Sequence, residues 1–126
     1  QLYLFYNTKD ALSNDFTFSK VILKYLEENY SKPLKIEDIG TYLYMSPAYL
    51  SRLFKSETGI TIKQSLTKIR MRHAQNLLIN TTMSVKDIGY SVGYQNDLRG
   101  FYKMFNKHFG MTCSQMRKNN FYLSEI

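Results

Sequence analysis

Apolar residues recur along this chain at the spacing of an α-helix. Leu50, Leu53 and Phe54, for example, stand at positions i, i+3 and i+4, which lie on one face of a helix. No stretch alternates apolar and polar residues as a half-buried β-strand does. We therefore predict an all-α fold of about seven helices. The predicted helices cover residues 19–30, 36–43, 47–58, 61–80, 84–92, 97–109 and 112–119.

Capping residues mark the ends of several of these helices. Ser46 and Pro47 open the 47–58 helix, because a hydroxyl accepts hydrogen bonds from unpaired backbone N–H groups and proline suits the first helical position. Gly59 follows that helix, and glycine readily takes the left-handed conformation that ends a helix. The pattern Thr-x-x-Gln of a capping box begins at Thr61 and again at Thr112. These signals indicate that the predicted helices have defined boundaries.

The chain also contains an internal repeat. The tripeptide Asp-Ile-Gly stands at residues 38–40 and again at 87–89, an offset of 49. Further along, three residues recur at an offset of 51, and the pairs are Phe54 and Phe105, Gly59 and Gly110, and Thr61 and Thr112. The second copy therefore holds two more residues between its first short helix and its Phe. Each copy has the order of a helix-turn-helix, in which the second helix presents its outer face to the major groove of DNA.

The repeat divides the chain into five predicted parts. Residues 19–60 and 81–119 form a first and a second helix-turn-helix subdomain, and residues 61–80 form a connecting helix of about 27 Å. Residues 1–18 are a leader or the end of an upstream element. Residues 120–126 are expected to form a tail.

The charge of the chain favours a polyanionic partner. Seventeen Lys and Arg against ten Asp and Glu give a net charge of +7, which suits nucleic acid first and an anionic membrane surface second. Glu57 is the only acid between residues 44 and 80, and residues 98–120 contain none. No apolar run is long enough to span a bilayer, no signal peptide is visible, and the single cysteine fits a reducing compartment. We expect a cytoplasmic protein that binds DNA rather than a membrane.

On these motifs the chain resembles the AraC/XylS family of transcription regulators. The likeness covers about residues 19–119. It is carried by the segments 39–40, 45–55, 57–59 and 69–74 with Leu77 and Leu78, and by Ile88, Gly89, 92–94, Phe101, Phe105, Gly110, Met116 and Arg117. The resemblance implies two helix-turn-helix subdomains that bind consecutive major-groove segments on one face of bacterial DNA and regulate transcription. It also implies a structural role for Arg70, and an upstream sensing or dimerisation domain.

The second copy departs from the family pattern. The segment 97–101 replaces the usual lead into the recognition helix, with one residue inserted relative to the common spacing, and Cys113 stands where the family usually has proline. Gly100 inside a helix costs roughly 1 kcal/mol relative to alanine. The register of base contacts is therefore less defined in the second recognition helix than in the first.

The outer faces of the two predicted recognition helices supply the candidate base contacts. Arg52 is the strongest candidate, because its guanidinium matches guanine O6 and N7; contact with a phosphate, or plain solvation, is the alternative. Ala48 suits a thymine methyl group and Ser51 suits either strand. The offset of 51 places Arg99, Tyr102 and Lys103 at the positions of these three residues.

A second set of residues is predicted to contact DNA phosphates. Lys55, Lys63 and Lys107 are cationic, and Asn106 is polar, while Tyr49 packs or contacts the backbone. Thr61 and Thr112 begin helices, where backbone N–H groups favour a phosphate. The alternative for both threonines is a simple helix cap.

The sequence does not indicate an enzyme. His73 and His108 lie far apart without acidic or cysteine residues at metal-ligand spacing, and Cys113 has no orienting third group. No glycine-rich phosphate loop is present. We expect no metal and no cofactor, and we expect Cys113 to be buried. The remaining alternative is a protein-interaction module of the same fold that contacts RNA polymerase or another regulator.

Overall fold

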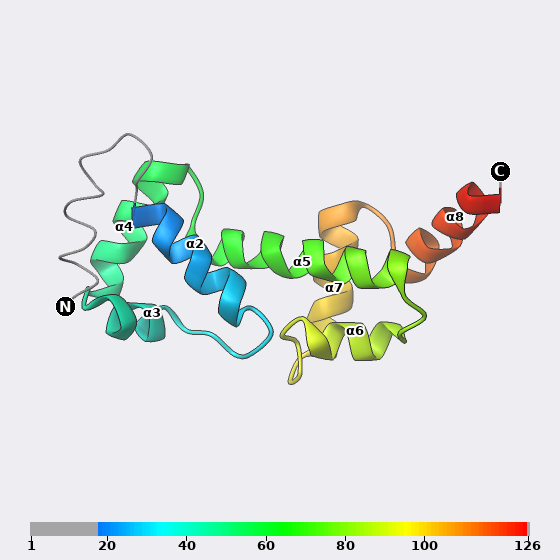
Figure 1. Ribbon diagram of the computed structural model, residues 1–126, viewed down its shortest axis with the longest axis horizontal. Helices are drawn as coiled ribbons and strands as arrows, with labels where there is room; N and C mark the ends of the chain where they lie inside the picture. Colours follow the sequence, from blue (N-terminus) through cyan, green and yellow to red (C-terminus); the bar gives the residue numbers. More distant parts are fainter. Residues whose placement is uncertain (1–17, 126) are drawn as a thin grey trace. The chain divides into compact units, whose positions relative to one another are not determined.

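The computed structural model describes residues 18–125, with side chains up to Asn120. The described chain forms seven helices and no strand, so the all-α prediction is confirmed (Figure 1). The helices are α2 (Phe18–Asn29), α3 (Ile36–Leu43), α4 (Pro47–Thr58), α5 (Ile62–Asn80), α6 (Val85–Ser91), α7 (Leu98–Phe109) and α8 (Cys113–Glu125). Residues 1–17 of the predicted leader lie outside the described part.

Six of the seven predicted helices begin and end within one residue of the observed bounds. The last helix is different, because it continues to Glu125 where the sequence was expected to give a tail after Asn119. The prediction was wrong here because residues 119–125 contain no glycine or proline to end the helix. Helix α8 therefore includes most of the segment assigned to the tail.

The chain forms two compact units, which meet in sequence inside α5. The first unit holds α2, α3, α4 and the start of α5. The second holds the rest of α5 with α6, α7 and α8, and also the short segment Tyr30–Pro33 that follows α2.

In the first unit, α2 and α3 both pack against α4. One side chain from each of these helices illustrates the core: Leu26, Leu43 and Phe54 are each almost completely excluded from solvent. The buried positions keep the spacing of three and four residues that the sequence predicts. The buried residues of this unit are Ser19, Val21, Ile22, Leu26, Ile39, Gly40, Leu43, Leu50, Phe54, Ile62 and Ser65.

In the second unit, α7 packs against α6 and α8. The side chains of Phe101 and Phe105 lie at the centre of the core, with ring centroids 6.1 Å apart. The inner face of α5 completes this core. Its buried members are Met71, Ala74, Leu78, Ile88, Val92, Phe101, Phe105, Cys113 and Met116. Within the described residues, no helix is both long enough and apolar enough to cross a membrane.

Candidate nucleic-acid interface

The first candidate recognition helix is α4, and its ends form as its sequence predicts. The Ser46 hydroxyl accepts a hydrogen bond from the Tyr49 N–H at 3.2 Å, and Gly59 takes the left-handed conformation with φ of 82°. Leu50 and Phe54 face the core. The opposite face is exposed, so its side chains are available to a partner. That face carries Ala48, Tyr49, Ser51, Arg52 and Lys55.

The second candidate recognition helix is α7, which has the same length as α4 and starts 51 residues later. Asp97 caps it by accepting a hydrogen bond from the Gly100 N–H at 2.9 Å, and Gly110 ends it in the left-handed conformation. Phe101 and Phe105 face the core. The exposed face carries Arg99, Tyr102, Lys103, Asn106 and Lys107. The structure therefore brings the predicted residues of each copy together on one helix face.

Gly100 has a local explanation that the sequence did not reveal. A Cβ atom at this position would lie 2.1 Å from Oδ2 of Asp97, which is far inside van der Waals contact. The carboxylate that caps α7 thus occupies the space of a side chain at residue 100. The cost of glycine in a helix is offset by the cap, which typically contributes about 1 kcal/mol.

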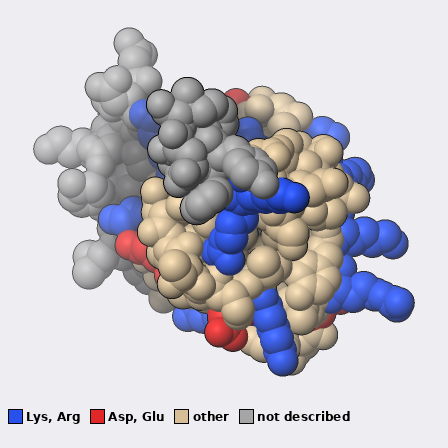
Figure 2. All heavy atoms as spheres, turned by 90° about the vertical axis from the view of Figure 1, so that its right-hand side faces the viewer, with Lys and Arg blue, Asp and Glu red and all other residues tan. Residues whose placement is uncertain are grey.

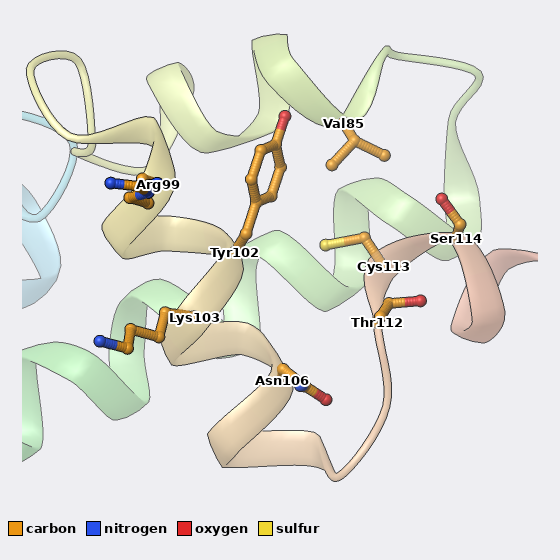
Figure 3. Close-up of a pocket in the computed structure, with 8 residues that line it drawn as sticks. All are labelled: Val85, Arg99, Tyr102, Lys103, Asn106, Thr112, Cys113 and Ser114. Carbon is orange, nitrogen blue, oxygen red and sulfur yellow. The ribbon is translucent and has the colours of Figure 1, made fainter.

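An open hollow of about 640 Å³ lies beside the exposed face of α7 (Figure 3). Figure 3 shows Arg99, Tyr102, Lys103 and Asn106 along α7 on one side, with the start of α8 on the other. The residues that line it are Val85, Arg99, Tyr102, Lys103, Asn106, Thr112, Cys113 and Ser114. Val85 and Ser114 were not singled out from the sequence, because neither is charged and both lie outside the recognition helix.

The starts of α5 and α8 are matched capping boxes. In α5, Gln64 N–H donates to the Thr61 hydroxyl at 3.0 Å and Thr61 N–H donates to the Gln64 side chain at 2.9 Å. In α8, Thr112 and Gln115 form the same pair of bonds at 3.1 and 2.9 Å. The cap interpretation of both threonines is therefore confirmed, while their phosphate contacts stay a prediction. Lys63 is exposed in the first turn of α5.

The turn that precedes each recognition helix begins identically in the two copies. The Gly40 carbonyl accepts from Met45 N–H at 2.9 Å, and the Gly89 carbonyl accepts from Tyr94 N–H at the same distance. In the first copy the N-cap Ser46 follows Met45 directly. In the second copy two residues separate Tyr94 from the N-cap, which places the predicted two-residue insertion at residues 95–96.

Two arginines of the basic segments donate hydrogen bonds to backbone carbonyl groups within the protein. Arg70 donates to the carbonyl groups of Tyr30 and Lys32 at 2.9 and 3.0 Å. Arg117 donates to those of Leu78 and Thr81, at the end of α5, at 3.1 and 3.3 Å. These contacts support the structural role implied for Arg70. The number of Lys and Arg residues in a segment is therefore larger than the number of cationic side chains that are available to DNA.

Arg70 is partly buried and lies beside an aromatic ring. The guanidinium lies 5.5 Å from the centre of the Tyr94 ring. Burial lowers the pKa of Arg70, and Tyr94 acts in the opposite direction. Burial raises the pKa of the Tyr94 hydroxyl, which the positive charge of Arg70 partly offsets.

Cys113 is buried, as expected from its sequence context. Burial raises the pKa of its thiol to about 11, against smaller opposing effects of a backbone hydrogen bond and Arg117. A thiol of this kind is protonated at neutral pH. His73 stacks on the Tyr30 ring with centroids 4.0 Å apart, and His108 meets the Phe109 ring edge-on with centroids 4.7 Å apart.

Long basic side chains project from the face of the molecule in Figure 2, where acidic side chains form only small patches. The exposed cations of the two recognition helices are Arg52, Lys55, Arg99, Lys103 and Lys107. No group of three or more potential metal ligands occurs in residues 18–125.

Two helix-turn-helix copies with matched exposed faces define the class of protein. A family model described as a helix-turn-helix domain matches residues 39–119. The chain belongs to the AraC-type helix-turn-helix family.

Regulators of bacterial operons are among its relatives. The chain is 39% identical over 93 residues to the lactose operon transcription activator of Staphylococcus xylosus, a match that spans 74% of this chain and 33% of that protein. It is 33% identical over 97 residues to the melibiose operon regulatory protein of Escherichia coli K12, covering 77% of this chain and 32% of that protein. The chain thus spans about a third of the length of these relatives.

Solved structures share the fold. The C-terminal domain of AraT, a response regulator from Geobacillus stearothermophilus, is 33% identical, with a TM-score of 0.79 over 85% of this chain and 88% of that chain. The DNA-binding domain of AdpA, solved in complex with a target DNA, is 23% identical, with a TM-score of 0.74 over 80% of this chain and 90% of that chain. The AdpA likeness concerns the fold alone.

Proposed function

We propose that the chain is the DNA-binding domain of a transcription regulator and reads double-stranded DNA with α4 and α7. The observation that carries this proposal is the matched pair of exposed faces at an offset of 51, each with cationic residues opposite a buried apolar face. Membership of the AraC-type family supports it. So do the names of relatives that regulate operons.

The base contacts are assigned to three residues on each helix. We propose that Arg52 reads a guanine through its two parallel donors, with Ala48 and Ser51 beside it. On α7 we propose that Arg99, Tyr102 and Lys103 read the second segment. A Lys ammonium is a point charge and does not match a guanine edge as an Arg fork does. We therefore expect sharper preference at the base pair read by Arg52 than at the base pair read by Lys103.

The surrounding residues are assigned to the DNA backbone. We propose that Tyr49, Lys55 and Lys63 contact phosphates near α4. The hollow beside α7 supports the same assignment for Asn106 and Thr112, because both line it and Thr112 stands at the start of α8, where backbone N–H groups favour an anion. The proposed phosphate contacts of the second copy are Asn106, Lys107 and Thr112.

Two further parts of the proposal concern the whole protein. We infer that this module works with a sensing or dimerisation domain, since its relatives are about three times as long as their match to this chain. We also infer that the protein acts in the bacterial cytoplasm, where its DNA lies. One relative, AdaA of Bacillus subtilis, is named as both a transcriptional activator and a DNA repair enzyme, but we propose a binding role and no catalysis for this chain.

Selection from a random pool of duplex DNA tests the proposed function. We expect an enriched motif with two segments about 34 Å apart, one turn of the double helix. Affinity for that motif should fall steeply as salt rises, because phosphate contacts release counterions. Enrichment of no motif would contradict the proposal. Binding to an RNA polymerase subunit in that case would favour the protein-interaction alternative.

A further inference from the structure

The two residues inserted before α7 form a compact β-turn. The Asp97 N–H donates to the Tyr94 carbonyl at 3.2 Å, so Gln95 and Asn96 occupy the two central positions of a four-residue turn. The residue after this turn pair, Asp97, is already the N-cap of α7. Any movement of the turn is thus passed directly to the start of the second recognition helix.

The side chain of Gln95 ties this turn to two other parts of the second unit. Its Nε2 donates to the carbonyl of Ser31 at 2.6 Å and to the carbonyl of Tyr90 at 2.8 Å. A glutamine amide nitrogen has two N–H donors, and both are used here. Tyr90 lies in α6, whereas Ser31 comes from the segment Tyr30–Pro33, 64 residues away in sequence.

The segment that receives Gln95 is itself held in the second unit by several contacts. Arg70 on α5 donates to the carbonyl groups of Tyr30 and Lys32, and the ring of Tyr30 stacks on His73. The chain also passes close to Gly93, where a Cβ atom would lie 2.6 Å from the Tyr30 carbonyl oxygen. Gln95 therefore donates to a segment that other contacts already hold in place.

The first copy has no equivalent of this arrangement. Its turn is shorter by the same two residues, and Met45 is followed directly by the N-cap Ser46. Among the described residues, no side-chain bond to a distant carbonyl is recorded for the turn Tyr44–Ser46. The insertion thus brings both the extra turn and the side chain that fixes it.

We propose that Gln95 is a positioning residue of the second recognition helix. By binding the Ser31 and Tyr90 carbonyl groups it fixes the inserted turn, and so sets the orientation with which α7 enters the major groove. The inference rests on the proposed function, because it concerns how α7 reads DNA. Both N–H donors of Gln95 are occupied within the protein, so its amide nitrogen is not available to donate to a base.

Four proteins, each put through selection from random duplex DNA, test the proposal: the unchanged chain, Gln95→Ala, Gln95→Glu and Asn96→Ala. Glutamate keeps the size of the side chain but cannot donate to a carbonyl group. Asn96 is the matched control, because it is the other inserted residue and is exposed. Arg52→Ala and Lys103→Ala, run alongside, identify which motif segment belongs to α4 and which to α7.

We expect Gln95→Ala and Gln95→Glu to weaken preference at all positions of the α7 segment by roughly three- to tenfold. Preference in the α4 segment and the melting temperature should change little, since Gln95 is a surface residue. Asn96→Ala should behave as the unchanged chain. This pattern would support a positioning role.

Other results would overturn the inference. Unchanged preference for Gln95→Ala, or for Gln95→Glu, would show that the two bonds do not orient α7. An equal loss after Asn96→Ala would implicate the turn in general, and a loss at a single base pair would make Gln95 a direct reader. A loss of base preference in both segments together with a lower melting temperature would show that Gln95 contributes only to the overall stability of the fold. If the unchanged chain enriches no motif, the proposed function fails instead.

Discussion

The two helix-turn-helix copies are alike where side chains are buried and differ where the backbone turns. Phe54 and Phe105 occupy the same position in recognition helices of equal length, and both are fully buried. The turns before these helices begin with the same hydrogen bond, and then the second copy adds two residues. The comparison shows that core packing fixes the position of each recognition helix. The length of the preceding turn, by contrast, differs between the copies without altering that packing.

The left-handed residue of each turn shows the same contrast. Tyr44 has φ of 58° in the first copy, and Gly93 has φ of 112° at the matching position, 49 residues later. Tyr44 is exposed, so its side chain meets no steric conflict and the only cost at this position is the strain of the left-handed backbone. Gly93 faces Tyr30 and Arg70 so closely that there is no space for a side chain. The packing around the turn, and not the turn geometry alone, decides which residue is tolerated.

The largest expected effect comes from the shared core position. Phe54→Ala and Phe105→Ala should each lower the free energy of unfolding by about 3–5 kcal/mol, because each removes a fully buried aromatic ring and leaves a cavity. Urea unfolding monitored by circular dichroism measures both. Exposed Tyr49→Phe serves as a control that should change it by less than about 0.5 kcal/mol. Clearly unequal losses would show that the two cores are not equivalent.

Substitution of the left-handed turn residue should have different effects on stability in the two copies. Gly93→Ala should destabilise the chain by roughly 1–3 kcal/mol from backbone strain, and the contact with the Tyr30 carbonyl should add to that loss. Tyr44→Gly should stabilise the chain by about 0–1.5 kcal/mol, since relief of about 1–2 kcal/mol of left-handed strain is only partly offset by the entropy of glycine, about 0.5–1 kcal/mol. Thermal unfolding of both variants tests this contrast. Equal destabilisation would contradict the role assigned to the packing around Gly93.

Removing the two matched cations tests the difference between the recognition helices. Arg52→Ala should weaken binding to the selected duplex by about 1–3 kcal/mol and relax preference at one base pair. Lys103→Ala should cost less, because an ammonium lacks the fork that matches guanine. Fluorescence anisotropy with the selected and a scrambled duplex measures both. If Arg52→Ala weakens both duplexes equally and lowers the salt slope by about 1, Arg52 is a phosphate contact.

The smallest expected effect concerns the starts of α5 and α8. Ile62 and Cys113 are both buried there at an offset of 51, but only the cysteine ionises. The unfolded thiol loses its proton near its ordinary pKa of 9.0 and the folded one near 11, so stability should fall as pH rises through this window.

The loss attributable to Cys113 should reach roughly 1 kcal/mol at pH 10. It is measured as the difference between the unchanged chain and Cys113→Ala in urea unfolding at pH 8 and pH 10, which removes the contribution of the tyrosines. A difference that stays constant across these pH values would contradict the raised pKa.

The helices and their caps could be predicted from the sequence because they depend on neighbours within four residues. Ser46, Gly59 and the two Thr-x-x-Gln boxes all act as their local pattern indicates. The end of α8 was mispredicted for a related reason, since no local stop signal exists there. The exposed faces of α4 and α7 also followed from periodicity, which is why the candidate contact residues lie on the same side of each helix.

Contacts between distant parts of the sequence were not predictable in the same way. The bonds of Arg70 to Tyr30 and of Gln95 to Ser31 join residues 40 and 64 positions apart, and no pattern in a single sequence reports such pairs. The sequence located a two-residue insertion but not its anchor. Nor does the sequence show that Arg117, in the segment 98–120 that contains no acid, donates to carbonyl groups at the end of α5.

By itself the sequence determined the all-α fold, the repeat and the outer face of each recognition helix, because helix periodicity and caps are local properties. Tertiary structure alone decided which cations hold the chain together, why Gly93 lacks a side chain, and how the inserted turn is anchored. These features depend on which carbonyl groups and rings come within contact distance after folding, and that distance is set by packing rather than by neighbouring residues.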